Sequence, residues 1–429
     1  AGGPLSHSPP GLIVPSMVTR NSLLWIVALC VTVAVTNRYT DYEADRELIG
    51  QAAGDSYSYF TIAEVAPALP HDTLAFHHSQ RIAVPYLIGT IHRLAPVSIH
   101  RVFQASVLLF EVAILLVFAG LLRSLSVQGR DAGVILAMLA LNPWAFRYYV
   151  TFPEMVNDLG FVLGFAIVLR GLLAGGIGTG VAGQLIASLG RPTGLLLVPF
   201  VFVWIWRDSR SWARHGARAR ALTGAAVAAC AVGVYVATAG IAATFAAPSE
   251  NGEHLLGLAT WITNQFDPAV LGLVLVRMLA SVAIPVACFV GVARHARVAG
   301  PTSGLIPLLV FGSVCCWAQP LLAGPEITAG SGERLVGRGL IPLLLALAIK
   351  LRDAGGLGVV ANVPRFGAII ALLALGSLHH VYINAGIPHP AARSTFAVLY
   401  TGACAGMFAL VYFRGPGAVR TMGEFHAAG

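Results

Sequence analysis

The sequence predicts an all-α polytopic membrane protein, and three observations support this fold class. Hydrophobic residues make up 57% of the chain, charged residues only 11%, and the mean hydropathy is +0.77, all far from the values of soluble proteins. Apolar runs close to the roughly 20 residues that a spanning helix requires recur along the chain. The net charge of +8 comes mainly from arginines in short loops between these runs, a pattern typical of membrane topology and not of nucleic-acid binding.

The apolar runs predict about 11–12 transmembrane helices. Spans are expected near residues 21–37, 99–122, 132–149, 156–173, 221–246, 268–293, 303–323, 338–352, 364–384 and 394–413. The segment 179–206 is long enough for two short spans that meet near Pro192, where neighbouring glycines favour a break. No soluble domain interrupts these runs, so residues 1–429 are interpreted as a single transmembrane domain.

The segment 81–95 decides which way the predicted chain is oriented in the membrane. It is apolar but short, and it contains Pro85, His92 and Arg93. If it does not cross, the arginine-rich loops share the cytoplasmic side. We therefore predict a membrane-lying helix there, cytoplasmic termini, and a first periplasmic loop over 38–98. The Ala, Gly, Val and Arg bias suggests a bacterial inner membrane as the location.

The first predicted loop is acidic and aromatic. Seven acids lie between Arg38 and Gln80, although the whole chain has only 19 Asp and Glu. Carboxylates beside a membrane are costly unless they are solvated or used, so this loop is the expected place for chemistry. Candidate polar side chains gather in this loop and in other predicted outer turns: Asp55, Tyr57, Tyr59, His77, His78 and Arg81; Glu154; Arg334 and Arg338; His379 and His380.

Several of these segments resemble GT-C glycosyltransferases. Gly54-Asp55-x-Tyr57-x-Tyr59-x-x-Ile62-Ala63 is similar to the segment that follows the first helix of that family. The stretch 78–85 resembles the region before its membrane-lying helix, 142–154 its next outer turn, and 332–342 its late Arg-x-x-x-Pro element. Residues 191–194 match its Arg-Pro-Thr-Gly corner.

The resemblance implies an inverting enzyme that takes a sugar from a polyprenyl-phosphate carrier and gives it to a lipid, glycan or protein acceptor. Asp55 is then the expected general base, and Glu154 matches the second acidic position. Arg334 and Arg338 are candidates for the donor phosphate, with Arg191 as a further contact. Tyr57, Tyr59, His77, His78, Arg81, His379 and His380 are the other candidates for binding substrate and membrane lipid.

Structural roles compete with these assignments. Asp55 and Glu154 can cap helices, and Arg191 can satisfy carbonyls that a helix break sets free. The run Asp41-x-Glu43-x-Asp45 offers another base or a solvated face. No metal ligands are predicted, because adjacent histidines point in different directions on regular structure. A divalent cation, Mg or Mn, remains a possible cofactor for the phosphate.

Two other functions are compatible with the sequence. A transporter or flippase suits about twelve spans but requires ionisable residues inside helices, where Glu111 is the main candidate. A surface-polysaccharide polymerase or ligase also uses lipid-linked glycans. Such proteins concentrate their function in a large late loop, and here the late outer loops are short. The acids in the first loop favour the glycosyltransferase.

Overall fold

The computed structural model describes residues 19–37, 52–71, 74–208, 210–246, 268–293, 302–323 and 332–356, with a few helical positions between 395 and 406. This part is helical and contains no sheet, only an isolated bridge between Leu74 and Ala246. The predicted spans 364–384 and 394–413 lie essentially outside it.

The helices follow the predicted apolar runs in order. The first half comprises α1 (Arg20–Thr36), α3 (Ala52–Val65), α4 (Phe76–Ser79), α5 (Ala83–Leu94), α6 (Ile99–Ser124), α7 (Gly129–Ala140), α8 (Phe146–Thr151), η1 (Pro153–Val156) and α9 (Asn157–Ala174). The second half comprises α10 (Ile177–Gly190), η2 (Pro192–Leu196), α11 (Leu197–Arg207), α12 (Ala217–Ala242), α14 (Pro268–Ala280), α15 (Ala283–Ala293), η4 (Ser303–Leu305), α16 (Ile306–Ala323) and α18 (Leu340–Asp353). Residues 332–337 are helical too.

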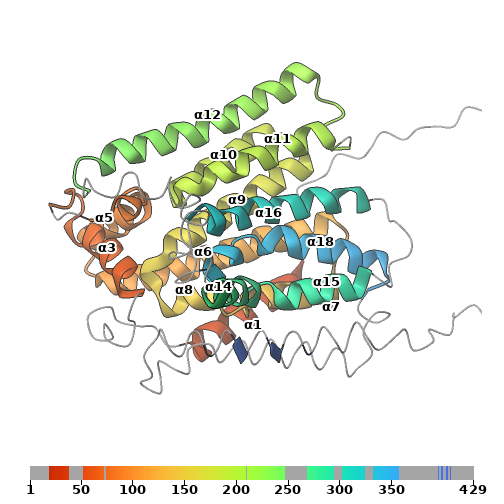
Figure 1. Ribbon diagram of the computed structural model, residues 1–429, viewed down its shortest axis with the longest axis horizontal. Helices are drawn as coiled ribbons and strands as arrows, with labels where there is room; N and C mark the ends of the chain where they lie inside the picture. The colour runs from red at the N-terminus through yellow and green to blue at the C-terminus, as the bar shows by residue number, and fades with distance from the viewer. Residues whose placement is uncertain are drawn as a thin grey trace, which may run out of the picture.

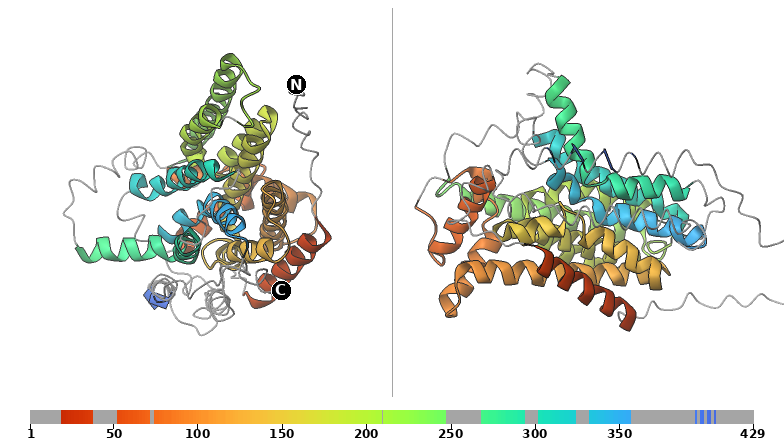
Figure 2. Two further views of the ribbon diagram at one scale, coloured as in Figure 1. Left: turned by 90° about the vertical axis from the view of Figure 1, so that its right-hand side faces the viewer. Right: turned by 90° about the horizontal axis from the view of Figure 1, so that it is seen from below.

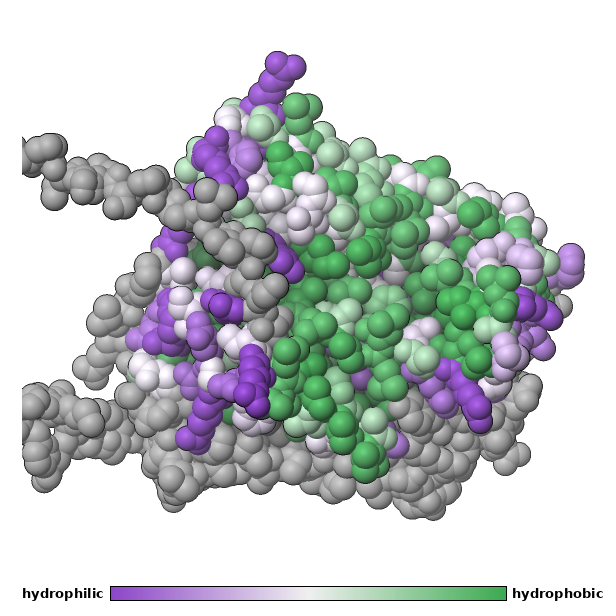
Figure 3. Space-filling view, turned by 180° about the vertical axis from the view of Figure 1, so that it is seen from behind, coloured by the Kyte–Doolittle hydropathy of each residue, from purple (hydrophilic) through white to green (hydrophobic). Residues whose placement is uncertain are grey.

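The long apolar helices indicate an integral membrane protein. In the described part, four helical segments are long and apolar enough to cross a membrane: Ile99–Ser124, Pro153–Ala174, Ala217–Ala242 and Ser303–Pro320. A fifth span results if the bent pair Val274–Ala280 and Ala283–Ala293 is counted as one. Figure 3 shows the matching surface, an apolar band between two margins that carry hydrophilic residues.

Several predicted spans are broken into shorter helices. For this reason, fewer described helical segments than predicted are long enough to cross a membrane. The run 132–149 forms α7 and α8, separated by a turn at Asn142-Pro143. The run 179–206 breaks as predicted: α10 ends at Gly190, and Pro192, which has no N–H to donate, begins η2. At 1.5 Å per residue, the 12-residue α7 is much shorter than a bilayer core.

The two ends of the helix bundle differ in chemistry. At one end, which we call the arginine end, Arg352 donates to the Leu125 carbonyl at 2.8 Å and Arg214 donates to the Ala174 carbonyl at 2.8 Å. The opposite end, which we call the loop end, carries α3 and α5, the orange helices in Figures 1 and 2. The described arginines of loops 123–130, 207–220 and 350–352 thus lie at the end opposite α3 and α5.

The segment 81–95 forms α5, a helix of 12 residues. It packs against α3 and α6 and leaves Leu87, Ile91 and Leu94 exposed, with Leu94 the most exposed at 83%. A short helix with an exposed apolar face suits a position at the membrane surface better than a crossing. It lies with α3 at the loop end (Figure 1).

The helices α9 and α10 pack in close contact next to the loop end. Glycines of α9 and α10 face each other so closely that a Cβ at Gly164 would lie 2.2 Å from the backbone nitrogen of Ala187. A Cβ at Gly190 would lie 2.5 Å from the backbone nitrogen of Phe161. Small residues allow membrane helices to approach in this way. The pair holds the N-terminus of α9 beside the break at Arg191.

Candidate functional site

Asp55 lies in the first turn of α3, where its carboxylate contacts two basic side chains. Oδ1 is 2.7 Å from Nε2 of His78, and Oδ2 accepts a hydrogen bond from Arg334 at 2.9 Å. The carboxylate is 23% exposed, so it is held firmly but can still be reached. The contact with Arg334 joins segments that lie 279 residues apart in the chain.

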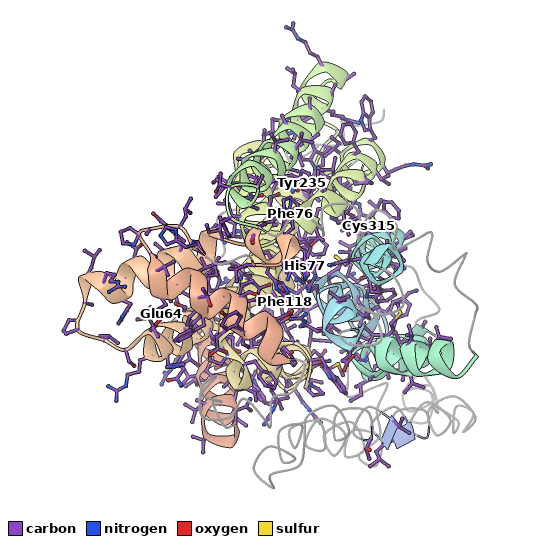
Figure 4. All side chains as sticks on the ribbon, turned by 60° about the vertical axis from the view of Figure 1, so that its left-hand side comes forward. Glu64, Phe76, His77, Phe118, Tyr235 and Cys315 are labelled. Atoms are coloured by element: carbon purple, nitrogen blue, oxygen red, sulfur yellow. The ribbon has the colours of Figure 1, made fainter. Side chains whose placement is uncertain are left out.

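His78 also contacts the helix that carries Asp55. Its Nδ1 is 3.0 Å from Oγ of Ser58, one turn after Asp55 on α3. The single turn of α4 places the rings of His77 and His78 only 3.9 Å apart, so the expectation that the two side chains diverge is wrong. Figure 4 shows His77 between the orange helices of the first loop and the cyan helices of the second half of the chain.

Tyr59 and Arg81 extend the site along α3. Arg81 donates to the hydroxyl of Tyr59, which is buried, and the Tyr59 ring contacts His78 edge to face. Burial raises the pKa of Tyr59 to about 12, although the positive charge of Arg81 opposes the shift. Tyr59 therefore keeps its proton and remains a hydrogen-bond donor at neutral pH.

Asp158 is the centre of a buried arginine cluster that sequence reasoning missed. Its Oδ1 lies 2.9 Å from Nη1 of Arg191, and its Oδ2 accepts from Nη2 of Arg338 at 3.0 Å. Nε of Arg334 lies 3.7 Å from the same oxygen, and the Tyr149 hydroxyl donates to it at 3.1 Å. The sequence analysis assigned no role to Asp158.

Positive charge exceeds negative charge in this cluster. The arginines 191, 334 and 338 are at most 4% exposed, and Arg81 adds a fourth positive charge, against the carboxylates of Asp55 and Asp158. Within the described residues, Nε of Arg191 and Nε of Arg338 are buried and donate no hydrogen bond. Buried guanidinium groups with spare donors favour an anionic ligand, and guanidinium geometry matches phosphate oxygens.

Glu154, the predicted second acid, lies in η1 and is 1% exposed. Its Oε1 is 3.8 Å from Nδ1 of His100, and among the described residues it forms no ion pair with the three clustered arginines. Asp158, one helical turn later, is the acid that forms ion pairs with these arginines. Of the remaining candidates, Tyr57 is 43% exposed on α3. His379, His380 and the Asp41–Asp45 run lie outside the described residues.

These contacts keep Asp55 ionised. Burial alone would raise the pKa of its carboxyl, but the charges of His78 and Arg334 outweigh burial and hold that pKa well below its usual range. Each oxygen has two acceptor positions and uses one of them in the contacts described above. Asp55 is therefore a carboxylate at neutral pH that can still accept a hydrogen bond.

No family model, curated protein or solved structure matches this chain. The site offers an ionised carboxylate that remains partly accessible, a neutral tyrosine and an excess of buried guanidinium groups. Such a set can orient a hydroxyl group through Asp55 while it stabilises an anion through the arginines.

Proposed function

We propose that the chain is an integral-membrane glycosyltransferase of the GT-C type, which transfers a sugar from a polyprenyl-phosphate carrier. The contact between Asp55 and Arg334 supports this proposal most directly. It puts the residue expected to activate the acceptor 2.9 Å from one expected to hold the donor phosphate. A group that holds the attacking hydroxyl must lie close to the groups that stabilise the leaving phosphate.

In the proposed reaction, the acceptor hydroxyl donates a hydrogen bond to the Asp55 carboxylate. Its oxygen attacks the anomeric carbon from the face opposite the phosphate, and the bond between that carbon and the phosphate oxygen breaks. The bonding electrons go to the phosphate, whose negative charge Arg334 and Arg338 stabilise. A carboxylate with a low pKa is a weak base, so Asp55 takes the proton only as the new bond makes the hydroxyl acidic.

The proposal includes the finer topology: about 11–12 spans, cytoplasmic termini and a loop end that faces the periplasm of a bacterial inner membrane. The position of the arginine end opposite the loop end supports this orientation. The exposed apolar face of α5 supports a membrane-lying helix beside the site, within reach of lipid-linked substrates.

Sugar transfer in detergent from a panel of polyprenyl-phosphate sugars tests this function. We expect transfer by the wild type and a loss of at least about a hundredfold in Asp55→Asn, since general base catalysis contributes on this scale. Glu64→Gln removes an exposed acid on the same helix; this variant is the matched control and should retain activity. If Asp45→Asn abolishes transfer and Asp55→Asn does not, the base lies in the Asp41–Asp45 run.

One observation favours a transporter instead. Glu111 lies inside α6, is 1% exposed and interacts electrostatically with Arg147 of α8. Buried ionisable groups in membrane helices often mark transport pathways. Movement of a labelled lipid-linked sugar across the membrane of reconstituted vesicles, without transfer to any acceptor, would overturn the enzyme proposal.

A further inference from the structure

Three side chains at the loop end can each direct one metal-ligating atom to a common point. The ligand atoms of Asp55, His77 and His78 all lie within 4.8 Å of one another. We propose that these three residues bind one divalent transition-metal ion, with zinc as the best fit. This inference concerns the site of the proposed transferase, but the ion would bind in the absence of any sugar donor.

The surroundings of His78 suit a metal ligand. A metal-bound histidine usually donates its other ring N–H to a nearby oxygen, which fixes the tautomer. Oγ of Ser58, 3.0 Å from Nδ1, is such an oxygen. When His78 is neutral with its proton on Nδ1, which is the form that binds a metal, Nε2 directs a lone pair at Oδ1 of Asp55, only 2.7 Å away. Two lone pairs at that distance repel each other unless a proton or a metal ion lies between them.

Asp55 can serve as a ligand without losing its contact with Arg334. The guanidinium binds Oδ2, while Oδ1 faces the histidines. The positive charge of Arg334 opposes a cation, so we expect micromolar affinity, weaker than that of closed structural zinc sites.

The ligand types select the metal. Two imidazole nitrogens and one carboxylate are the ligand set of many catalytic zinc sites, which keep one position open. Magnesium and calcium prefer sites made of oxygen atoms alone and are expected to bind poorly. In a tetrahedral site with bonds of about 2.0–2.2 Å, the ligand atoms lie roughly 3.3–3.6 Å apart. Oδ1 of Asp55 and Nε2 of His78, which are 2.7 Å apart, would therefore separate when the ion binds. The partly exposed His77 can approach by side-chain rotation.

The open position gives the ion a role in the proposed reaction. Because Asp55 is itself one of the ligands, an acceptor hydroxyl bound at that position would lie beside the carboxylate that contacts Arg334. A metal-bound hydroxyl has a lowered pKa, which compensates for the weak basicity of the Asp55 carboxylate. The ion would then activate the acceptor, while the arginines stabilise the phosphate.

Binding is tested with tag-free protein in detergent, purified in the presence of a chelator that is then removed. Cobalt(II) serves as the probe because its visible absorption reports coordination by the protein, and zinc is added to displace it. We expect one equivalent of cobalt to bind, zinc to displace it, and excess magnesium to have no effect. His77→Ala should weaken binding by at least about tenfold, since even the partners of metal ligands contribute 10–100-fold.

His71→Ala is the matched control, because His71 is an exposed histidine of the same loop and should not affect binding. If His77→Ala does not elute as a single folded species, His77→Gln is used in its place to test the loss of this ligand. The proposal is wrong if the wild type binds no cobalt or zinc, or if a folded His77 variant binds as tightly as the wild type. Metal binding without sugar transfer would refute the transferase and leave the metal site intact.

Discussion

Replacing Asp158 with asparagine is expected to lower the free energy of unfolding by about 3–5 kcal/mol, the usual effect of removing one partner from a buried ion pair. Arg191 and Arg338 each lie within 3.0 Å of this carboxylate, and Arg334 lies 3.7 Å away. Asparagine keeps the shape but removes the charge. Three guanidinium groups would then remain buried beside one another, with the partly exposed Asp55 at the edge of the cluster.

Thermal unfolding in a single detergent, followed by the loss of the monodisperse species, measures this effect. The control is Glu64→Gln, which removes an exposed acidic charge at the same end of the bundle and should leave the midpoint unchanged. An Asp158→Asn protein as stable as the wild type would show that the arginines do not depend on this carboxylate.

Gly164→Ala is expected to lower the free energy of unfolding by about 1–3 kcal/mol or more, the range for overpacking a close contact. The added Cβ would lie 2.2 Å from the backbone nitrogen of Ala187 and 2.6 Å from the carbonyl oxygen of Gly183. Both are backbone atoms, so α9 and α10 would have to separate. Because α9 carries Asp158, and α10 ends beside Arg191, we also expect sugar transfer to fall.

Gly178→Ala provides the comparison on the same helix pair. A Cβ at Gly178, in the first turn of α10, meets no atom within 4 Å. Alanine there removes backbone freedom from the unfolded chain and should be neutral or stabilising by less than about 1 kcal/mol. Equal midpoints for Gly164→Ala and Gly178→Ala would contradict the close approach of α9 and α10.

The helical class could be predicted because it depends on local properties of the chain. Apolar runs of spanning length predict helices directly. Pro192, with a glycine nearby on either side, predicts a helix break, and the structure has this break after Gly190. An outer turn over 142–154 was also predicted, but the span 132–149 was drawn too long, since its apolar residues continue past Asn142-Pro143, where the chain breaks between α7 and α8. The count of 11–12 spans stays a prediction.

The candidate site was harder to predict because its contacts join distant segments. That Asp55 and Arg334 share one end of the bundle follows from counting spans, but their direct contact depends on how the helices pack. Glu154 and Asp158 differ by one helical turn, and the sequence gives no reason to prefer either. Only the positions of Arg191 and Arg338 show that Asp158 is the acid in the cluster. The rings of His77 and His78 lie close together because α4 is only a single turn, which the sequence did not predict.

The long separation between Asp158 and its later partners also sets an order of events during biosynthesis. Arg191 follows Asp158 closely in the chain, whereas Arg338 comes 180 residues after it. A nascent chain that has inserted α9 and α10 thus contains a neutral carboxylate–guanidinium pair, which is easier to keep in the membrane than a lone charge. Arg334 and Arg338 are made only after α16, so the contact between Arg334 and Asp55 cannot form earlier. A nascent chain that has not yet reached Arg334 therefore lacks two of the three clustered guanidinium groups.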